Sequence, residues 1–150
     1  MPTLFLICGL PGSGKTTLSK RIARDRPALR LAEDEWMIRL YPARYGSDDA
    51  KRELVKSVQW ETAERALRLG VDVVLDWGFW GRSERDEYRS RAEALGVRAK
   101  LCFLDVPRDE LWRRLMARNA ALPPSTYRVS EALLDLCCEM FQPPTPDELQ

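Results

Sequence analysis

The most informative absence from this 150-residue sequence is histidine, which does not occur at all. Histidine is the commonest general base and a frequent metal ligand, so catalysis by a Ser-His or Cys-His pair is excluded. A group that accepts a proton must therefore be a carboxylate or a less usual alternative.

Long apolar runs and paired cysteines are also missing. No stretch approaches 18 consecutive apolar residues, and the apolar run at the N-terminus is too short for a signal-peptide core and lacks a basic segment before it. The four cysteines show no C-x-x-C spacing, and two of them lie in apolar strand-like runs. We therefore expect a cytoplasmic protein with reduced thiols and no membrane attachment.

The sequence has almost no excess charge of either sign. It contains 24 basic and 23 acidic side chains, so no general cationic field favours nucleic acid or an anionic membrane. A local basic patch remains compatible with this balance. No obligatory protein partner is evident.

The length and the periodicity predict the fold. A chain of 150 residues suits one domain with one core, expected over residues 1–150. Apolar β-forming runs at 3–8, 29–32, 71–75 and 97–105 alternate with helical patterns that follow the first run and recur at about 50–69, 83–96, 107–119 and 130–141. This alternation predicts an α/β fold, a parallel sheet of four or five strands flanked by helices, with the ligand at the carboxyl ends of the strands.

Three details of this fold are specific enough to be tested. Leu54 and Val58 are expected to face inward from the helix at 50–69, because they follow its apolar period. Ser83 is expected to cap the next helix. The proline-rich residues 143–146 predict an extended tail.

The most specific motif is a glycine-rich turn between the first strand and a helix. It fits the phosphate-binding loop G-x-x-x-x-G-K-[ST] without a mismatch over Gly9, Leu10, Pro11, Gly12, Ser13, Gly14, Lys15, Thr16 and Thr17. The glycines let backbone N–H groups curl around a phosphate, and the helix N-terminus adds roughly half a positive charge. Lys15 is expected to reach the terminal phosphates of a nucleotide, and Thr16 to offer a hydroxyl to Mg²⁺.

Carboxylates follow two of the other expected strands. Asp34 follows the second strand and is our candidate for the group that accepts the proton of an acceptor hydroxyl, with Glu33 and Glu35 as rivals. Asp76 follows the third strand and has the placement of a carboxylate that binds magnesium. Acidic residues also favour helix starts and turns, which is the alternative role for each.

Arginines follow the fourth strand. Arg114 and Arg118 lie one turn apart on the helix at 107–119, before a proline-containing loop. Like charges so close repel unless an anion lies between them, so residues 114–130 are expected to form a lid that clamps phosphates. A solvated basic face is the alternative.

Weaker candidates for contact with the acceptor surround the third strand and the segment after Asp34. They are Arg39, Trp77, Phe79, Trp80 and Arg82. The aromatic side chains are expected either to stack on the acceptor or to pack across the top of the sheet. Arg39 is expected either to contact substrate or to pair with Glu35 one turn before it.

Taken together, these motifs resemble a small P-loop kinase. The similarity is to the kinase domain of bacteriophage polynucleotide kinase and to the chloramphenicol phosphotransferase and zeta-toxin group. It lies in four segments, which are the phosphate loop, the Asp34 segment, Val-Val-Leu-Asp76, and Leu-Asp-Val-Pro107 with the arginines that follow it. The Asp-Trp-Gly-Phe-Trp loop and the Pro-Pro-Thr-Pro-Asp-Glu tail resemble those of small bacterial ATP-binding proteins. The resemblance implies the P-loop NTPase fold and ATP with Mg²⁺, with Asp34 as general base and Arg114 or Arg118 as the lid arginine.

Two departures from polynucleotide kinase bear on the acceptor. That family carries Arg-Asp-Asp-Tyr-Arg where this chain has Glu-Asp-Glu-Trp-Met at 33–37, so Met37 replaces an arginine expected near an acceptor phosphate. The aromatic loop is also less polar. The resemblance therefore favours transfer of the γ-phosphoryl group of ATP to a hydroxyl of a small molecule. A polynucleotide 5′-hydroxyl kinase is one alternative, and a regulatory nucleotide-binding switch that hydrolyses ATP slowly is another.

Overall fold

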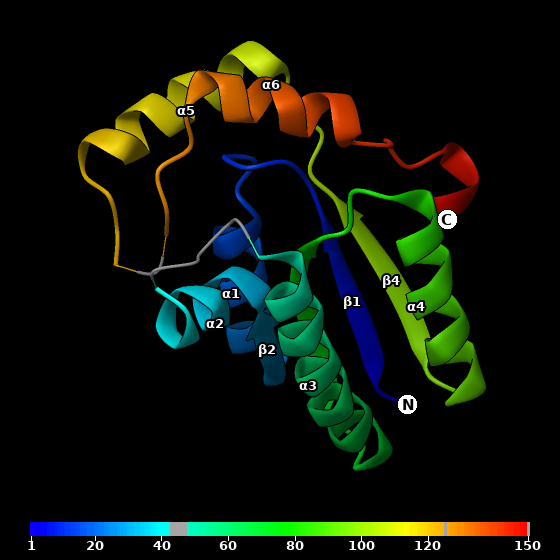
Figure 1. Cartoon of the computed structure of the whole chain (residues 1–150). Coiled ribbons are helices and arrows are strands. Elements are labelled where there is room, and N and C mark those ends of the chain that lie inside the picture. The colour runs from blue at the N-terminus through cyan, green and yellow to red at the C-terminus, as the bar shows by residue number, and fades with distance from the viewer. Residues whose placement is uncertain (43–47, 125, 150) are drawn as a thin grey trace.

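The structure is a computed structural model that describes residues 1–42, 48–124 and 126–149 (Figure 1). Its one sheet within these residues has four parallel strands in the order β2-β3-β1-β4. They are β1 (Thr3–Cys8), β2 (Ala28–Ala32), β3 (Asp72–Gly78) and β4 (Arg98–Phe103). The predicted α/β fold with a parallel sheet is thus confirmed.

Six α-helices and a short 3-10 helix surround the sheet in the described residues. They are α1 (Lys15–Asp25), α2 (Glu33–Leu40), α3 (Asp49–Arg68), α4 (Arg82–Ala94), α5 (Arg108–Ala120), α6 (Glu131–Met140) and η1 (Pro146–Leu149). Over the same residues, none of these helices combines the length and the apolarity needed to cross a membrane.

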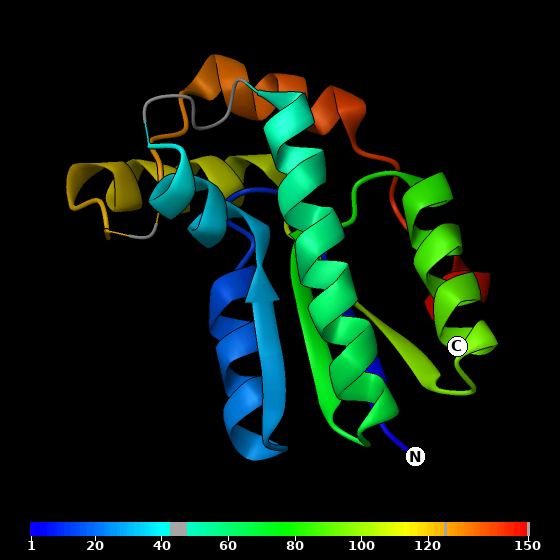
Figure 2. The ribbon, with the colours of Figure 1, turned by 60° about the horizontal axis from the view of Figure 1, so that its bottom comes forward.

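β1 lies inside the sheet because every one of its side chains is apolar or small and buried. Leu4 and Leu6 face the side covered by α3 and α4, whereas Phe5 and Ile7 face the side covered by α1. Figures 1 and 2 show these helices on opposite sides of the sheet. The strand therefore belongs to both cores, as its unbroken apolar run predicts.

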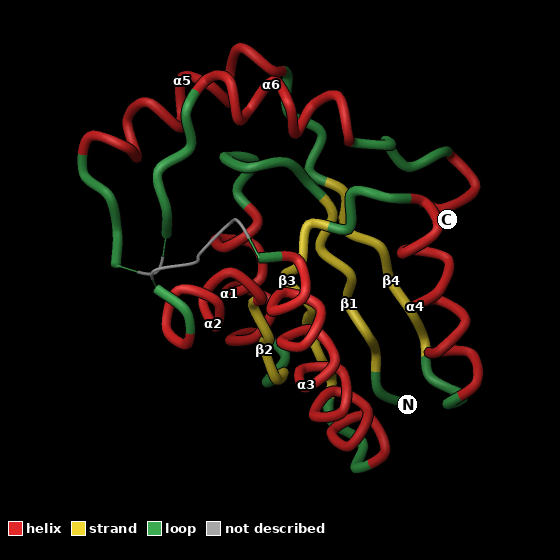
Figure 3. The backbone as a smooth tube through the Cα atoms, in the orientation of Figure 1, coloured by secondary structure: helices red, strands yellow, loops and turns green. Residues whose placement is uncertain are grey.

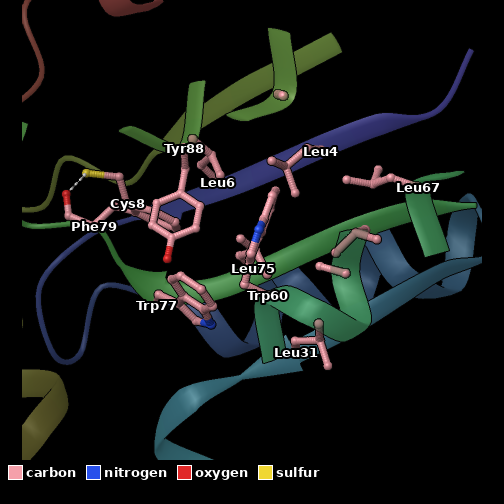
Figure 4. Close-up of a cluster of buried hydrophobic side chains, with 13 residues drawn as sticks. Leu4, Leu6, Cys8, Leu31, Trp60, Leu67, Leu75, Trp77, Phe79 and Tyr88 are labelled. Carbon is pink, nitrogen blue, oxygen red and sulfur yellow. Dashed lines mark hydrogen bonds between the residues drawn. The ribbon is translucent and has the colours of Figure 1, made fainter. Parts of the chain in front are cut away.

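The larger core, between the sheet and α3 and α4, is rich in aromatic rings (Figure 4). Tyr88 meets Trp60, Trp77 and Phe79 edge-on, with ring centroids 5.2, 5.0 and 5.8 Å apart. Trp77 and Phe79 are stacked at 5.5 Å. Packing across the top of the sheet, one of the two roles considered for the aromatic loop, is therefore what Phe79 does.

α5 and α6 pack on each other and extend across the carboxyl ends of the strands (Figure 1). Their shared cluster contains Leu111, Leu115 and Leu134, and Leu10 of the phosphate loop packs against it. Figure 3 shows the loop after β1 beneath these two helices. The fold thus places a helical layer directly over the glycine-rich loop.

The inward face of α3 was wrongly predicted in its first half, although Ala63 and Leu67 farther along the helix are buried as their period predicts. Leu54 is 53% exposed and Val58 is 43% exposed, while Val55 is 3% exposed. The helix turns a different face to the sheet because Gln59 is fully buried, donating from Nε2 to the Ala32 carbonyl at 3.1 Å and accepting from Trp77 Nε1 at 2.7 Å. The spacing of apolar residues in the sequence gives no indication that a glutamine is buried.

Two element boundaries also differ from expectation. β3 continues through Gly78 rather than ending before Asp76, because Asp76 still pairs with Ala32 of β2. Gly81, not Ser83, caps α4. No serine cap is needed there, since the Arg82 backbone N–H donates to the Gln142 side chain at 2.8 Å.

The predicted extended tail is correct only in part. Residues 143–145 are outside any helix, but Pro146 begins η1, and Glu148 within η1 is buried. Proline at the first position of a helix is well tolerated because its missing N–H has no partner there in any case. The tail is therefore a packed element of the fold.

The corrected face of α3 can be tested with two neighbouring alanine substitutions. Val55→Ala should lower the free energy of unfolding by about 1–2 kcal/mol, since it removes two buried methyl groups while alanine gains slightly in helix propensity. Leu54→Ala removes a larger but exposed side chain and should change it by less than about 0.5 kcal/mol. Urea unfolding followed by circular dichroism measures both. An equal or larger loss for Leu54→Ala would contradict the face described here.

Candidate active site

The glycine-rich loop is shaped by two residues with positive φ. Gly12 has φ 84° and Gly14 has φ 97°, a region that side-chain-bearing residues rarely adopt. A Cβ on Gly12 would also lie 3.0 Å from Leu115 Cγ and 3.1 Å from the Leu111 carbonyl oxygen. The loop can thus approach α5 only because this position is glycine.

The loop presents hydrogen-bond donors that the described residues leave partly unsatisfied. The Ser13 hydroxyl is buried without a hydrogen-bond partner among the described residues. Lys15 Nζ donates to the Leu10 carbonyl at 3.1 Å, and burial lowers the pKa of this amine. The helix start at Gly14 has no side-chain cap. A buried cation, an unused hydroxyl and uncapped backbone N–H groups together fit a bound phosphate chain.

A pair of carboxylates stands at the start of α2, where β2 ends. Arg52 Nη1 from α3 donates to Glu33 Oε1 at 2.5 Å and to Asp34 Oδ1 at 2.8 Å. Burial raises the pKa of Glu33 to about 7, against the opposing effects of Lys56 and Arg52. Both carboxylates line the cleft, but the Asp34 side chain is 43% exposed and that of Glu33 only 8%, so Asp34 is the more accessible of the two to a ligand.

Asp76 occupies the adjacent strand at the same edge of the sheet. Its Oδ2 accepts from Ser19 Oγ at 2.8 Å and from Arg30 Nη2 at 3.1 Å. Both hydrogen bonds use the same oxygen, which leaves Oδ1 for another ligand. With the Thr16 hydroxyl, also at the cleft, this makes an oxygen-donor pair of the kind Mg²⁺ takes beside a nucleotide.

The arginines of α5 reach toward the loop in different ways. Arg114 Nη1 lies 3.4 Å from the Gly12 carbonyl oxygen, and its Nε donates to Glu110 at 3.0 Å. Arg118 Nη2 donates to the Tyr127 carbonyl at 3.2 Å, while its Nε is buried with no hydrogen-bond partner in the described part of the chain. Burial lowers the pKa of Arg118 and the nearby Asp34 charge raises it. Of these two arginines, Arg118 is thus the one with an N–H donor that no described group accepts.

These groups line one large cleft of about 1360 Å³. Its floor is the phosphate loop and the ends of β2 and β3, and its walls come from α2, α3, α5, α6 and residues 123–124 and 126–128. Lys15, Thr16, Asp34, Asp76, Arg114 and Arg118 all contribute to it, together with Trp77 and Trp80. The sequence-predicted donor residues therefore come together in space.

Three of the weaker candidates lie elsewhere. Phe79 is fully buried in the aromatic core. Arg82 is on the surface, where it pairs with Asp86 and Asp147. Arg39 does not line the large cleft but borders a second hollow, next to Trp36, that shares Glu35 and Pro124 with it. The two tryptophans are the members of this group that line the cleft.

Sequence reasoning missed several residues of the cleft. Arg30 alternates with leucines in β2, and Arg52 and Lys56 are basic residues of a helix, so neither pattern by itself points to a site. Their spacing of four residues, which places them on one side of α3, was the available signal. The apolar wall from α6, including Leu136 and Met140, has no local signature at all.

Comparison with known proteins agrees with this architecture. A protein-family model described as AAA domain (AAA_33) matches residues 4–144. Shikimate kinase of Phocaeicola vulgatus is 30% identical over 151 residues, an alignment that covers 95% of this chain and 79% of that protein.

Solved structures show the same fold at lower identity. A putative kinase from Chloroflexus aurantiacus has a TM-score of 0.73 at 21% identity, covering 97% of this chain and 83% of the other. A gluconokinase from Sinorhizobium meliloti has a TM-score of 0.69 at 20% identity, with coverage of 97% and 78%. Kti12 of Chaetomium thermophilum, solved with ADP-AlF3, has a TM-score of 0.71 at 18% identity, with coverage of 96% and 82%.

The predicted resemblance to small P-loop kinases is therefore confirmed, and so is ATP with Mg²⁺ as the cofactor of this group. Because the family model spans nearly the whole chain and a kinase relative aligns over almost all of it, the chain belongs to the AAA_33 family of P-loop kinases.

Proposed function

We propose that this ATP-dependent kinase phosphorylates a hydroxyl of a small molecule that carries at most one negative charge. The observation that carries the proposal is the charge pairing inside the cleft. On the side formed by α2 and α3, Arg52 is paired with Glu33 and Asp34, and Lys56 is paired with Glu33 and Glu84. These cations are already neutralised and have little attraction left for an anionic acceptor.

The opposite side of the cleft has the reverse character. Lys15 and Arg118 have no ion pair with a carboxylate among the described residues, and both are at least partly buried. Unpaired buried cations favour a polyanion. The imbalance supports nucleotide phosphates beside the loop and α5, and a weakly charged acceptor beside α2 and α3. A polynucleotide 5′ end, with a phosphate on each following nucleotide, matches this second environment poorly.

The acceptor side also has an apolar component. Leu136 and Met140 of α6 line the cleft although each side chain is more than half exposed. Trp77 and Trp80 line it as well. Leu136 and Met140 border the cleft and remain uncovered, which is typical of apolar groups that contact a ligand. The proposed acceptor therefore has an apolar face in addition to its hydroxyl.

The roles of the residues follow from these positions. The loop from Gly9 to Thr17 would hold the ATP phosphates, and Thr16 with Asp76 would hold Mg²⁺. Bound MgATP supplies the transferable phosphoryl group and a divalent charge beside it. We assign to Asp34 the role of accepting the proton of the acceptor hydroxyl, because it is the more accessible carboxylate of the α2 pair. Lys15 and Arg118 would offset the negative charge that moves during transfer.

The extent of the catalytic unit is part of the proposal. We treat residues 1–150 as one kinase domain and residues 114–130 as an arginine-bearing lid, of which residue 125 lies outside the described residues. A cytoplasmic location stays a prediction, supported by four free cysteines.

The acceptor class is tested by ATP consumption in the presence of single acceptors. The panel contains shikimate and gluconate, after the relatives that bear those names, with neutral sugars, nucleosides and a 5′-hydroxyl oligonucleotide. We expect at least one small molecule to raise turnover more than tenfold over ATP alone, and the oligonucleotide to have no such effect. Lys15→Ala, which removes the buried cation, is the inactive control.

Two outcomes of that panel would contradict the proposal. Stimulation by the oligonucleotide alone would favour the polynucleotide kinase. Turnover that is the same with every compound as with ATP alone would favour the regulatory switch.

The proton-accepting role of Asp34 is tested by Asp34→Asn. We expect kcat to fall by about 10²–10⁴ with the KM for ATP little changed, because the amide keeps the shape but cannot take a proton. Glu33→Gln tests the rival, and Glu53→Gln, an exposed carboxylate of α3, is the matched control. Steady-state kinetics with the best acceptor provide both constants. A larger loss of kcat in Glu33→Gln than in Asp34→Asn would move the role to Glu33.

The α5 arginines should act on the rate more than on binding. Arg118→Ala is expected to lower kcat by a factor of about 10²–10³, because the free N–H donor of Arg118 faces charge that develops during transfer. Arg114→Ala should lower kcat less, since Glu110 already accepts a hydrogen bond from that side chain. Arg113→Ala, an exposed neighbour on the same helix, should leave kcat within a factor of two. The same assay measures all three. Unchanged kcat in both Arg114→Ala and Arg118→Ala would indicate that the two arginines form a solvated basic face with no role in the transfer.

A further inference from the structure

Two sequence motifs are joined in the structure by contacts that play no part in the proposed chemistry. They are the aromatic loop after β3 and the C-terminal residues 142–149, which we call the C-terminal clasp. The Gln142 backbone N–H donates to the Trp80 carbonyl at 2.8 Å, and the Gln142 side chain accepts from the Arg82 N–H at 2.8 Å. The clasp thus holds the aromatic loop through both its backbone and a side chain.

The most deeply buried contact of the clasp is an ion pair. Arg85 donates to Glu148 twice, from Nε at 2.8 Å and from Nη2 at 3.2 Å, and both side chains are inaccessible to solvent. Arg89 donates to the same carboxylate at 2.9 Å. The hydrogen bonds to Glu148 lower its pKa to about 2 in spite of burial. A desolvated pair of this kind contributes little net stability, so its geometry is the more informative feature.

That geometry fixes one carbonyl of the aromatic loop. Arg85 Nη1 donates to the Phe79 carbonyl at 2.8 Å, and the Cys8 thiol lies 3.3 Å from the same oxygen (Figure 4). Phe79 has φ 46°, a left-handed conformation that is unfavourable for a bulky side chain and persists only where the surroundings enforce it. The Arg85–Glu148 pair is part of what enforces it.

The next residue carries this constraint to the phosphate loop. Trp80 Nε1 donates to the Gly9 carbonyl at 2.9 Å, and the Gly9 N–H donates to the Gly78 carbonyl at 2.9 Å. A Cβ on Gly78 would lie 2.9 Å from Trp80 Nε1, so the indole fits only against a glycine. The first residue of the phosphate loop is therefore held at its N–H by Gly78, the last residue of β3, and at its carbonyl by Trp80 of the aromatic loop.

We propose that the C-terminal clasp is a positioning element for nucleotide binding, acting through Trp80. Glu148 and Arg85 fix the Phe79 carbonyl, the loop then directs the Trp80 indole at Gly9, and Gly9 sets the start of the phosphate cradle. Glu148 and Arg85 do not line the cleft, so neither touches the nucleotide. The proposal rests only on the nucleotide-binding half of the proposed function, and the identity of the acceptor does not enter it.

The first test is the affinity for MgADP, measured by isothermal titration calorimetry on the full chain at 10 °C. Trp80→Phe keeps the ring but loses the N–H donor, and we expect its Kd to rise by about 2–10-fold, the usual effect of one hydrogen bond. Trp112→Phe on α5, whose side chain is outside the cleft, is the matched control and should stay within a factor of two. An unchanged Kd in folded Trp80→Phe would overturn the proposal.

The second test asks whether the clasp acts through that indole. Glu148→Gln should also raise the Kd for MgADP by at least twofold, but should add little in the Trp80→Phe background, because the two changes interrupt one chain of contacts. Glu93→Gln, an exposed carboxylate on α4, is the control. Fully additive effects, or a normal Kd in folded Glu148→Gln, would overturn the coupling.

Loss of fold is distinguished from loss of position by thermal unfolding of every variant. A purely structural role lowers Tm and leaves the Kd of the folded protein unchanged, which counts against the proposal. Gln142→Ala is a milder second variant that removes only the side-chain acceptor for Arg82, and we expect a smaller rise in Kd with little change in Tm. Because MgADP binding needs no acceptor, failure of the kinase assay leaves these measurements interpretable.

Discussion

Parallel pairing of β1 with β3 on one side and β4 on the other is the constraint on which the site depends. Parallel strands end at a common edge, so the glycine loop after Cys8 and the carboxylates after Ala32 and Leu75 meet there without any further device. The buried apolar residues of β1 hold this arrangement on both faces of the sheet. Chemical groups that are spread from Gly9 to Asp76 in the sequence are thereby brought to a single cleft.

Within that cleft, ion pairing divides the space into two environments. Carboxylates at the start of α2 occupy the cations of α3, whereas the lysine of the loop and Arg118 are left without a carboxylate among the described residues. Because unpaired buried cations attract polyanions and neutralised ones do not, the two halves suit different parts of a phosphoryl-transfer reaction. The division is a property of the side-chain pairs, not of the net charge of the protein, which is nearly zero.

Much of this was accessible from the sequence because it is local. The phosphate loop, the four strands and the interior place of β1 all follow from contiguous residues. What failed depended on distant partners. The buried Gln59 needs Ala32 and Trp77 to be satisfied, and Glu148 needs Arg85, 63 residues earlier. No period or motif encodes such pairs, so the α3 face, the tail and the roles of Arg52 and Lys56 emerged only from the structure.

The Gln59 bridge has a consequence for how such a cleft can change over evolutionary time. It ties the end of β2 to the end of β3, so the spacing between those two walls cannot vary without stranding buried polar groups. α6 lines the same cleft with exposed Leu136 and Met140, and neither makes a hydrogen bond to the floor in the described structure. Substitutions at Leu136 or Met140 can therefore reshape one wall of the cleft without leaving a buried polar group unpaired, whereas a substitution at Gln59 cannot.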